Sequence, residues 1–140
     1  MDNQRIIYQN AEGGVSVIIP TGEIPIEDVI EKDLPAGVEY SVVEASDLPS
    51  DRYFRKAWRA TDGGVEIDIE AAKGVQRDKW REARAPKLAA LDVEFIRAME
   101  QEDTVQLSTI ATKKQELRDV TATPLPDDIA GIKETWPEIL

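Results

Sequence analysis

The fold is decided by residues 76–120, which read QRDKWREARAPKLAALDVEFIRAMEQEDTVQLSTIATKKQELRDV. In the first half, apolar side chains recur at spacings of three and four residues, at Leu88, Leu91, Phe95 and Met99. That spacing places them on one face of an α-helix and predicts that this face packs against another element. Pro86 precedes the stripe, so we expect it either to kink the helix or to start a new helix after Ala85.

A second helix is predicted after a short polar break. Residues 101–103 interrupt the apolar pattern, and Asp103 followed by Gln106 has the spacing of a capping box. Beyond it, one helical face carries Leu107, Ile110, Ala111, Leu117 and Val120. Because few residues separate the two apolar faces, we expect the helices to pack as an antiparallel hairpin.

The residues after the hairpin are punctuated by proline. Residues 121–126 are expected to be extended, and Asp127 or Asp128 to cap a short last helix that runs through Ile132. Trp136 and Pro137 follow close to the end of the sequence. Burying a tryptophan side chain gains roughly 2–3 kcal/mol, so we expect this segment to dock on its own domain or on a partner.

The N-terminal half has the alternation of short β-strands. Strands are predicted at residues 5–8, 15–19 and 38–43, and a further strand holds Val65, Ile67 and Ile69 between acidic residues. Gly-Gly pairs at 13–14 and 63–64 indicate hairpin turns. Residues 24–34 have a helical period, with Pro25 suited to the first turn and Pro35 ending the helix. The predicted fold class is α+β: a small antiparallel β domain with a short helix at residues 1–70, then a helical hairpin and an extended tail at residues 71–140.

Composition excludes several classes of function. The 140 residues include 28 acidic and 17 basic side chains, a net charge of −11, which disfavours binding to nucleic acid over a broad surface. The sequence has no histidine and no cysteine, so neither a Cys/His metal site nor a histidine general base can form. We expect no catalytic residue, no cofactor and no metal. No apolar segment suits a secretory signal or a membrane span, so we expect a soluble protein with no membrane partner.

A basic cluster stands out against this acidic background. It comprises Lys73, Arg77, Lys79, Arg81, Arg84 and Lys87. One hypothesis is that Arg77, Arg81 and Arg84 contact an acidic partner or another copy of the chain. The alternative is a solvated helix face with local ion pairs.

Two further groups of residues have simple structural interpretations. The run from Arg52 to Arg59 interleaves aromatic and basic residues, as single-strand binders do, but Phe54 and Trp58 can equally anchor this loop to the core. The acidic groups lack the residue pattern of a calcium loop and are interpreted as helix caps and solvated faces.

Three motifs of the C-terminal half resemble one known family. They are Arg77-Asp78-Lys79-Trp80-Arg81-Glu82-Ala83-Arg84 with Lys87-Leu88, then Lys113-Lys114-Gln115-Glu116-Leu117-Arg118-Asp119-Val120, and finally Trp136-Pro137-Glu138. Together they resemble the tail-assembly chaperones and tail-fibre assembly proteins of tailed bacteriophages. Residues 15–20 and 51–58 look like small uncharacterised proteins of phage tail regions.

The resemblance implies a non-enzymatic phage tail protein that helps tail or tail-fibre subunits to fold or assemble. The alternative within the same family is a permanent structural or adaptor component of the virion tail. The implied partner is a tail or tail-fibre protein, with self-association as a further option, and Trp136 and Pro137 join the three arginines as candidate partner-binding residues. The implied location is the host cytoplasm during assembly, or the virion tail if the protein is retained.

Overall fold

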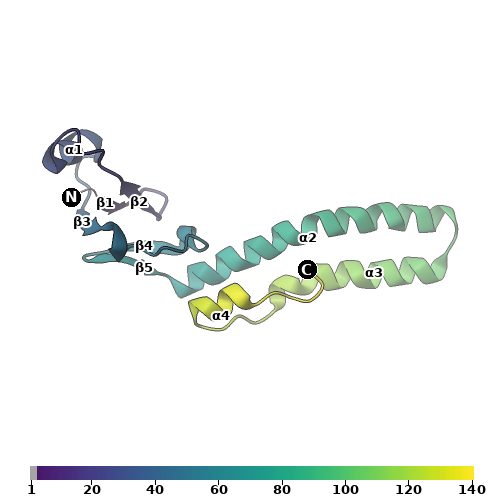
Figure 1. The fold of residues 1–140 in the computed structure, drawn as a ribbon. Helices are drawn as coiled ribbons and strands as arrows, with labels where there is room; N and C mark the ends of the chain where they lie inside the picture. The colour runs from purple at the N-terminus through teal and green to yellow at the C-terminus, as the bar shows by residue number, and fades with distance from the viewer. Residues whose placement is uncertain (1–2) are drawn as a thin grey trace. The chain divides into compact units, whose positions relative to one another are not determined.

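The computed structural model describes residues 3–140, which form the strands and helices labelled in Figure 1. The chain divides into two compact units, residues 1–72 and 73–140. The expected boundary, after residue 70, lies two residues before this division. Helix α2, Ile69–Glu100, begins in the last residues of the N-terminal unit and continues into the C-terminal unit.

The N-terminal unit holds two small antiparallel sheets. Strands β1 (Gln4–Gln9), β2 (Val15–Ile18) and β3 (Tyr40–Glu44) form the first, in the order β2-β1-β3. Strands β4 (Trp58–Thr61) and β5 (Gly64–Ile67) form the second. Helix α1 (Ile26–Asp33) and two single 3-10 turns, η1 (Ala45–Asp47) and η2 (Arg55–Ala57), complete the unit. With the helices of the C-terminal unit, these sheets confirm the predicted α+β fold class.

The core of the N-terminal unit lies between the two sheets. Ile7, Val15 and Val43 from the first sheet form a buried cluster with Trp58 from the second. Ile6, which points to the opposite face of β1, is also fully buried, and Val29 of α1 is the buried residue of that helix. Both faces of the central strand are therefore covered.

The last predicted strand of this unit ends earlier than the sequence pattern indicated. Ile69 was expected to continue the alternation, but β5 ends at Ile67 and Ile69 is the first residue of α2. The carboxylate of Asp68 accepts a hydrogen bond from the backbone N–H of Ala71 at 3.2 Å, which is the contact of a helix N-cap. The cap at Asp68, and not the alternation of apolar residues, therefore decides where the strand ends and the helix begins.

The C-terminal unit is a helical hairpin with a returning segment. Helix α2 packs beside α3 (Thr104–Arg118), which is followed by the 3-10 turn η3 (Asp119–Ala122) and by α4 (Ile129–Glu134). Pro86 lies inside one continuous helix, which excludes the alternative of a new helix after Ala85. The expected extended segment begins after η3, at Thr123 instead of Thr121. We call the loop end of the hairpin, residues 92–103, its tip, and residues 73–87 of α2 with the end of α3 its stem.

Both predicted helix caps are confirmed. The carboxylate of Asp103 accepts from the backbone N–H of Gln106 at 3.0 Å, after Glu102 has turned the chain with a φ of 55°. Likewise, the carboxylate of Asp128 accepts from the N–H of Gly131 at 2.7 Å and starts α4. Short polar side chains at these positions thus set the start of each helix.

The two apolar faces of the hairpin differ in part from the expected ones. Ile110, Leu117 and Val120 are buried as predicted, while Leu88, Leu91, Phe95 and Leu107 are half-buried. Met99 and Ala111 were wrongly placed in this interface, because both are exposed and Ala98 is buried instead. Ala98 lies seven residues after Leu91, which returns it to the same face of α2, whereas Met99 is rotated about 100° further round the helix.

No helix among residues 3–140 combines the length and the apolar composition that crossing a bilayer requires.

Candidate functional site

The residues after α4, 135–140, are tied to the stem of the hairpin by two buried side chains. The indole N–H of Trp80 donates to the carbonyl oxygen of Thr135 at 3.1 Å, and the amide nitrogen of Gln76 donates to the same oxygen at 3.0 Å. Trp80 and Gln76 are both fully buried. A buried amide needs partners, so this carbonyl fixes the place where the returning chain meets α2.

Ile139 of this segment forms one wall of a shallow groove between α2 and α3. The groove has a volume of about 420 Å³ and is lined by Lys87, Ala90, Leu91, Lys113, Glu116, Leu117 and Ile139. The Lys87 ammonium donates to the carbonyl oxygen of Ile139 at 3.1 Å. Ile139 and Leu140 are half-buried, so the end of the sequence is docked within its own unit.

Trp136 and Pro137, two of the predicted partner-binding residues, lie in this docked segment. The indole N–H of Trp136 donates to the carbonyl oxygen of Lys133 at 3.1 Å, yet 44% of the residue remains exposed. Pro137 is half-buried, and its carbonyl oxygen accepts from the N–H of Leu140 at 3.0 Å. The segment is thus held in place by its backbone, while much of the indole faces solvent.

The three predicted arginines do not form one outward face. Arg84 donates to the carbonyl oxygens of Arg118 at 2.9 Å and Leu117 at 3.3 Å, and Arg77 donates to that of Thr121 at 3.3 Å. These carbonyls end α3 and η3, where a cation also compensates the negative end of the helix dipole. Arg84 and Arg77 therefore stabilise the end of α3, and their contact with a partner stays a prediction.

Arg81 is the arginine of the three that points to solvent. Its guanidinium pairs with the carboxylate of Asp78 at 2.6 Å, and half of its side chain is exposed. That is the local ion pair expected of a solvated helix face. Of the three arginines, Arg81 is the one best placed to meet another molecule.

A further ion pair joins the stem to the start of α4. The ammonium of Lys73 lies 2.6 Å from a carboxylate oxygen of Asp127. The hydrogen bond from Lys73, followed by its positive charge, lowers the pKa of the Asp127 carboxyl. The basic cluster is thus largely used to hold the C-terminal unit together.

Sequence reasoning missed an exposed apolar surface at the tip of the hairpin and the adjoining first turn of α3. Val93 and Ile96 of α2 and Val105 of α3 are 49%, 56% and 75% exposed, and Met99 joins them at 56%. The sequence does contain a signal for this surface, because the apolar residues of α2 recur on two faces of the helix and not on one. This surface lies apart from the docked segment at the stem.

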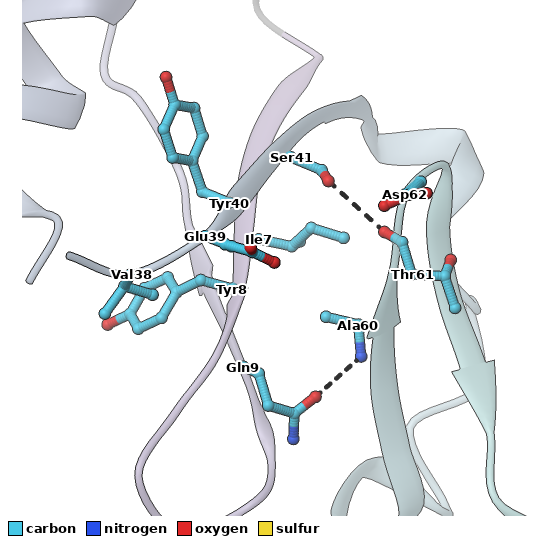
Figure 2. A pocket seen from close by; sticks show the side chains of 10 residues that line it. All are labelled: Ile7, Tyr8, Gln9, Val38, Glu39, Tyr40, Ser41, Ala60, Thr61 and Asp62. Carbon is cyan, nitrogen blue, oxygen red and sulfur yellow. Dashed lines mark hydrogen bonds between the residues drawn. The ribbon is translucent and has the colours of Figure 1, made fainter.

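The N-terminal unit has a pocket of its own, shown in Figure 2, with a volume of about 490 Å³. It lies where β4 meets the edge of the first sheet, and the amide oxygen of Gln9 accepts from the backbone N–H of Ala60 at 3.1 Å. Its lining residues are Ile7, Tyr8, Gln9, Val38, Glu39, Tyr40, Ser41, Ala60, Thr61 and Asp62. The carboxylates of Glu39 and Asp62 and the hydroxyls of Ser41 and Thr61 are its polar side chains, and the Ser41 hydroxyl donates to the carbonyl oxygen of Thr61 at 3.5 Å.

The aromatic and basic run of the N-terminal unit serves its core. Phe54 and Trp58 are buried, and the guanidinium of Arg55 stacks 4.5 Å from the centre of the Trp58 ring. Burial, with a smaller effect from the neighbouring Arg52, lowers the pKa of Arg55. The structure therefore supports the anchoring interpretation of this loop.

Among residues 3–140, no group of three or more acidic side chains lies in an arrangement that could hold a metal ion. Comparison of the chain with protein-family models, with curated proteins and with solved structures gives no match. The surfaces described above therefore carry the functional argument.

Proposed function

We propose that this chain is a non-enzymatic phage tail protein that assists the folding or assembly of tail or tail-fibre subunits. The proposal joins the family resemblance to one observation about the C-terminal unit. The three motifs that carry the resemblance, which are far apart in the sequence, meet at the stem of the hairpin. Trp80 of the first motif holds Thr135, the residue before the Trp-Pro motif, and Arg84 caps the helix end formed by the second.

This convergence supports a binding role for the stem. A segment whose backbone carbonyls accept from Trp80, Gln76 and Lys87, and which leaves a large indole partly exposed, can present that indole to another protein. Tryptophan is enriched among the residues that carry most of the binding energy in protein interfaces. We assign Trp136 and Pro137 as the contact for the tail subunit.

Co-expression tests the proposal. Each tail and tail-fibre subunit encoded in the same phage genome is expressed alone, with the wild-type chain, and with the Trp136→Ala variant. We expect one subunit to gain soluble, assembled product with the wild-type chain and to lose most of it with the variant. Tyr40→Ala, which removes an aromatic residue of similar exposure from the other unit (47% against 44%), is the matched control.

The melting temperature of each variant separates binding from folding. Trp136→Ala should melt close to the wild type, because its indole is half outside the fold. If no subunit responds to the wild-type chain, the assembly role is wrong. Mass spectrometry of purified particles then tests the alternative role, a permanent component of the virion tail. Such a component is present at fixed stoichiometry, whereas an assembly factor is absent.

A further inference from the structure

The outward face of α2 carries a second apolar stripe that the hairpin does not cover. We call it the outer stripe, and its residues, all exposed, are Ala85, Ala89, Val93, Ile96 and Met99. Each residue advances about 100° around a helix, so spacings of four, four, three and three keep these side chains within an arc of about 120°. The stripe facing α3 consists of other residues, namely Leu88, Leu91, Phe95 and Ala98.

Charge is distributed unevenly along the outer stripe. Residues 73–87 contain six basic and two acidic side chains, whereas residues 92–103 contain five acidic and one basic. Arg81 and Glu100 lie near the two ends of the stripe and, by the same helical geometry, on its side of α2. The helix therefore has a positive end and a negative end with apolar side chains between them.

We propose that the outer stripe is the contact surface for a second copy of this chain, with the two α2 helices antiparallel about a two-fold axis near residue 92. In that register residue 85 lies level with residue 99 of the other copy along the helix axis, and residue 89 lies level with residues 95 and 96. The small side chains of Ala85 and Ala89 then lie opposite the large ones of Met99 and Ile96, as close helix packing requires. The surface is self-complementary, as a two-fold interface must be.

The charged ends of α2 favour the same antiparallel arrangement. An antiparallel pair places the positive end of each α2 beside the negative end of the other, so that Arg81 comes near Glu100 of the second copy. A parallel pair would place like charges side by side along the whole contact. Electrostatics thus favours the antiparallel register that the side-chain sizes also favour.

The net charge of −11 does not prevent this association. Residues 1–72 hold 15 acidic and 6 basic side chains, while residues 73–140 hold 13 acidic and 11 basic. The unit that carries the outer stripe is therefore close to neutral. Charges elsewhere are screened beyond about 8 Å at physiological ionic strength. Self-association through this surface is independent of the tail-assembly role.

Cysteine cross-linking tests both the surface and the direction of the helices. The full-length chain has no cysteine, so Ala85→Cys and Met99→Cys introduce unique thiols. A mixture of the two variants should form a disulfide-linked heterodimer under mild oxidation. Met99→Cys alone should not link, because the two thiols would lie about 21 Å apart, beyond the reach of a disulfide. Linkage of Met99→Cys to itself with none between positions 85 and 99 would overturn the antiparallel arrangement.

Sedimentation equilibrium tests the association itself. We expect a concentration-dependent monomer–dimer equilibrium for the wild type and a monomer for Ile96→Glu. Ile19→Glu is the matched control, since it makes the same change at a residue of similar exposure in the other unit (59% against 56%), and it should still dimerise. Circular dichroism verifies that both variants are folded. A wild type that stays monomeric at every concentration would overturn the proposal, even if the stripe then binds another protein.

Charge reversal supplies an independent check. Arg81→Glu and Glu100→Arg should each weaken the homodimer, because each change places like charges together at both ends of the contact. A mixture of the two variants should restore association as a heterodimer. Absence of any rescue in the mixture would contradict the pairing of the stem of one copy with the tip of the other.

Discussion

At the scale of single residues, the C-terminal unit depends on a few buried donors that meet backbone carbonyls. Gln76 and Trp80 are fully buried and share the carbonyl oxygen of Thr135. Neither hydrogen bond was visible in the sequence, where Trp80 lies between members of the basic cluster. A hydrogen bond between residues more than fifty positions apart follows from the path of the returning chain, which local patterns do not specify.

The shared carbonyl leads to a prediction of non-additivity. Trp80→Phe and Gln76→Leu each remove one donor but leave the other, so we expect each hydrogen bond lost to cost about 0.5–1.5 kcal/mol, in addition to any change in packing. The double variant leaves the Thr135 oxygen without either donor and should lose about 1–3 kcal/mol more than the sum. Urea unfolding of the four proteins measures this coupling. Strict additivity would contradict a shared acceptor.

The ion pair between Lys73 and Asp127 predicts a pH effect. The pKa of Asp127 is lowered in the folded state, so the pair stabilises the fold above the pKa of an unfolded aspartate, about 3.9, and this contribution is lost as pH falls through the folded value. Asp127→Asn should therefore melt slightly below the wild type at neutral pH and level with it in strong acid. Since Asp127 is exposed, we expect a small difference. A gap that persists in acid would show that the effect does not come from the ion pair with Lys73.

At the scale of elements, sequence periodicity predicted the helices better than their contacts. Helix caps are local, and the cap at Asp103 was predicted correctly, while for α4 the sequence left Asp127 and Asp128 open and the structure selects Asp128. The long helix was predicted, but Met99 was assigned to the wrong face, because α2 has apolar residues on two faces and the pattern does not say which one α3 covers. Pro86 also left two alternatives open. It is exposed, so the carbonyl that it leaves without an intrahelical partner can be solvated, and the helix continues.

The hairpin interface predicts a graded series of stabilities. Leu117 is 2% exposed, so Leu117→Ala should cost about 2–5 kcal/mol. Phe95 is half-buried under the Lys114 ammonium, 5.3 Å from the ring centre, and Phe95→Ala should fall below the 3–5 kcal/mol that is typical of a buried phenylalanine. Met99→Ala should change monomer stability little.

Denaturant melts at low protein concentration, where the monomer prevails, measure this series. The order Leu117, Phe95, Met99 is the test, with Met99→Ala as the internal control for loss of an exposed side chain. A cost for Met99→Ala equal to that for Leu117→Ala would place Met99 back in the hairpin interface.

At the scale of the whole molecule, the chain separates an acidic β unit from a nearly neutral helical unit. The expected boundary after residue 70, taken from the change from a two-residue to a helical period, lies two residues from this division. The sequence did not predict that most of the basic cluster would be used inside the C-terminal unit. Arg77, Arg84 and Lys87 find carbonyl partners on η3, α3 and the docked segment, and such partners appear only once the chain has returned to the stem.

Two truncations of the docked segment distinguish its contribution to stability from its contribution to binding a tail subunit. A chain ending at Thr135 keeps the acceptor for Gln76 and Trp80 but loses the half-buried Ile139 and Leu140 and the bond from Lys87, so we expect a loss of stability in proportion to the apolar surface uncovered. A chain ending at Glu134 also removes that acceptor, while Gln76 keeps the carbonyl oxygen of Lys133 at 3.4 Å, so we expect a further loss of about 1–3 kcal/mol that comes mainly from Trp80. Thermal melts compare the two chains. If residues 136–140 bind a tail subunit, the chain ending at Thr135 stays folded at the temperature of co-expression and yet fails to increase soluble subunit. If it stays folded and supports full yield, Trp136 and Pro137 are not the contact, and the binding surface must be sought elsewhere on the chain.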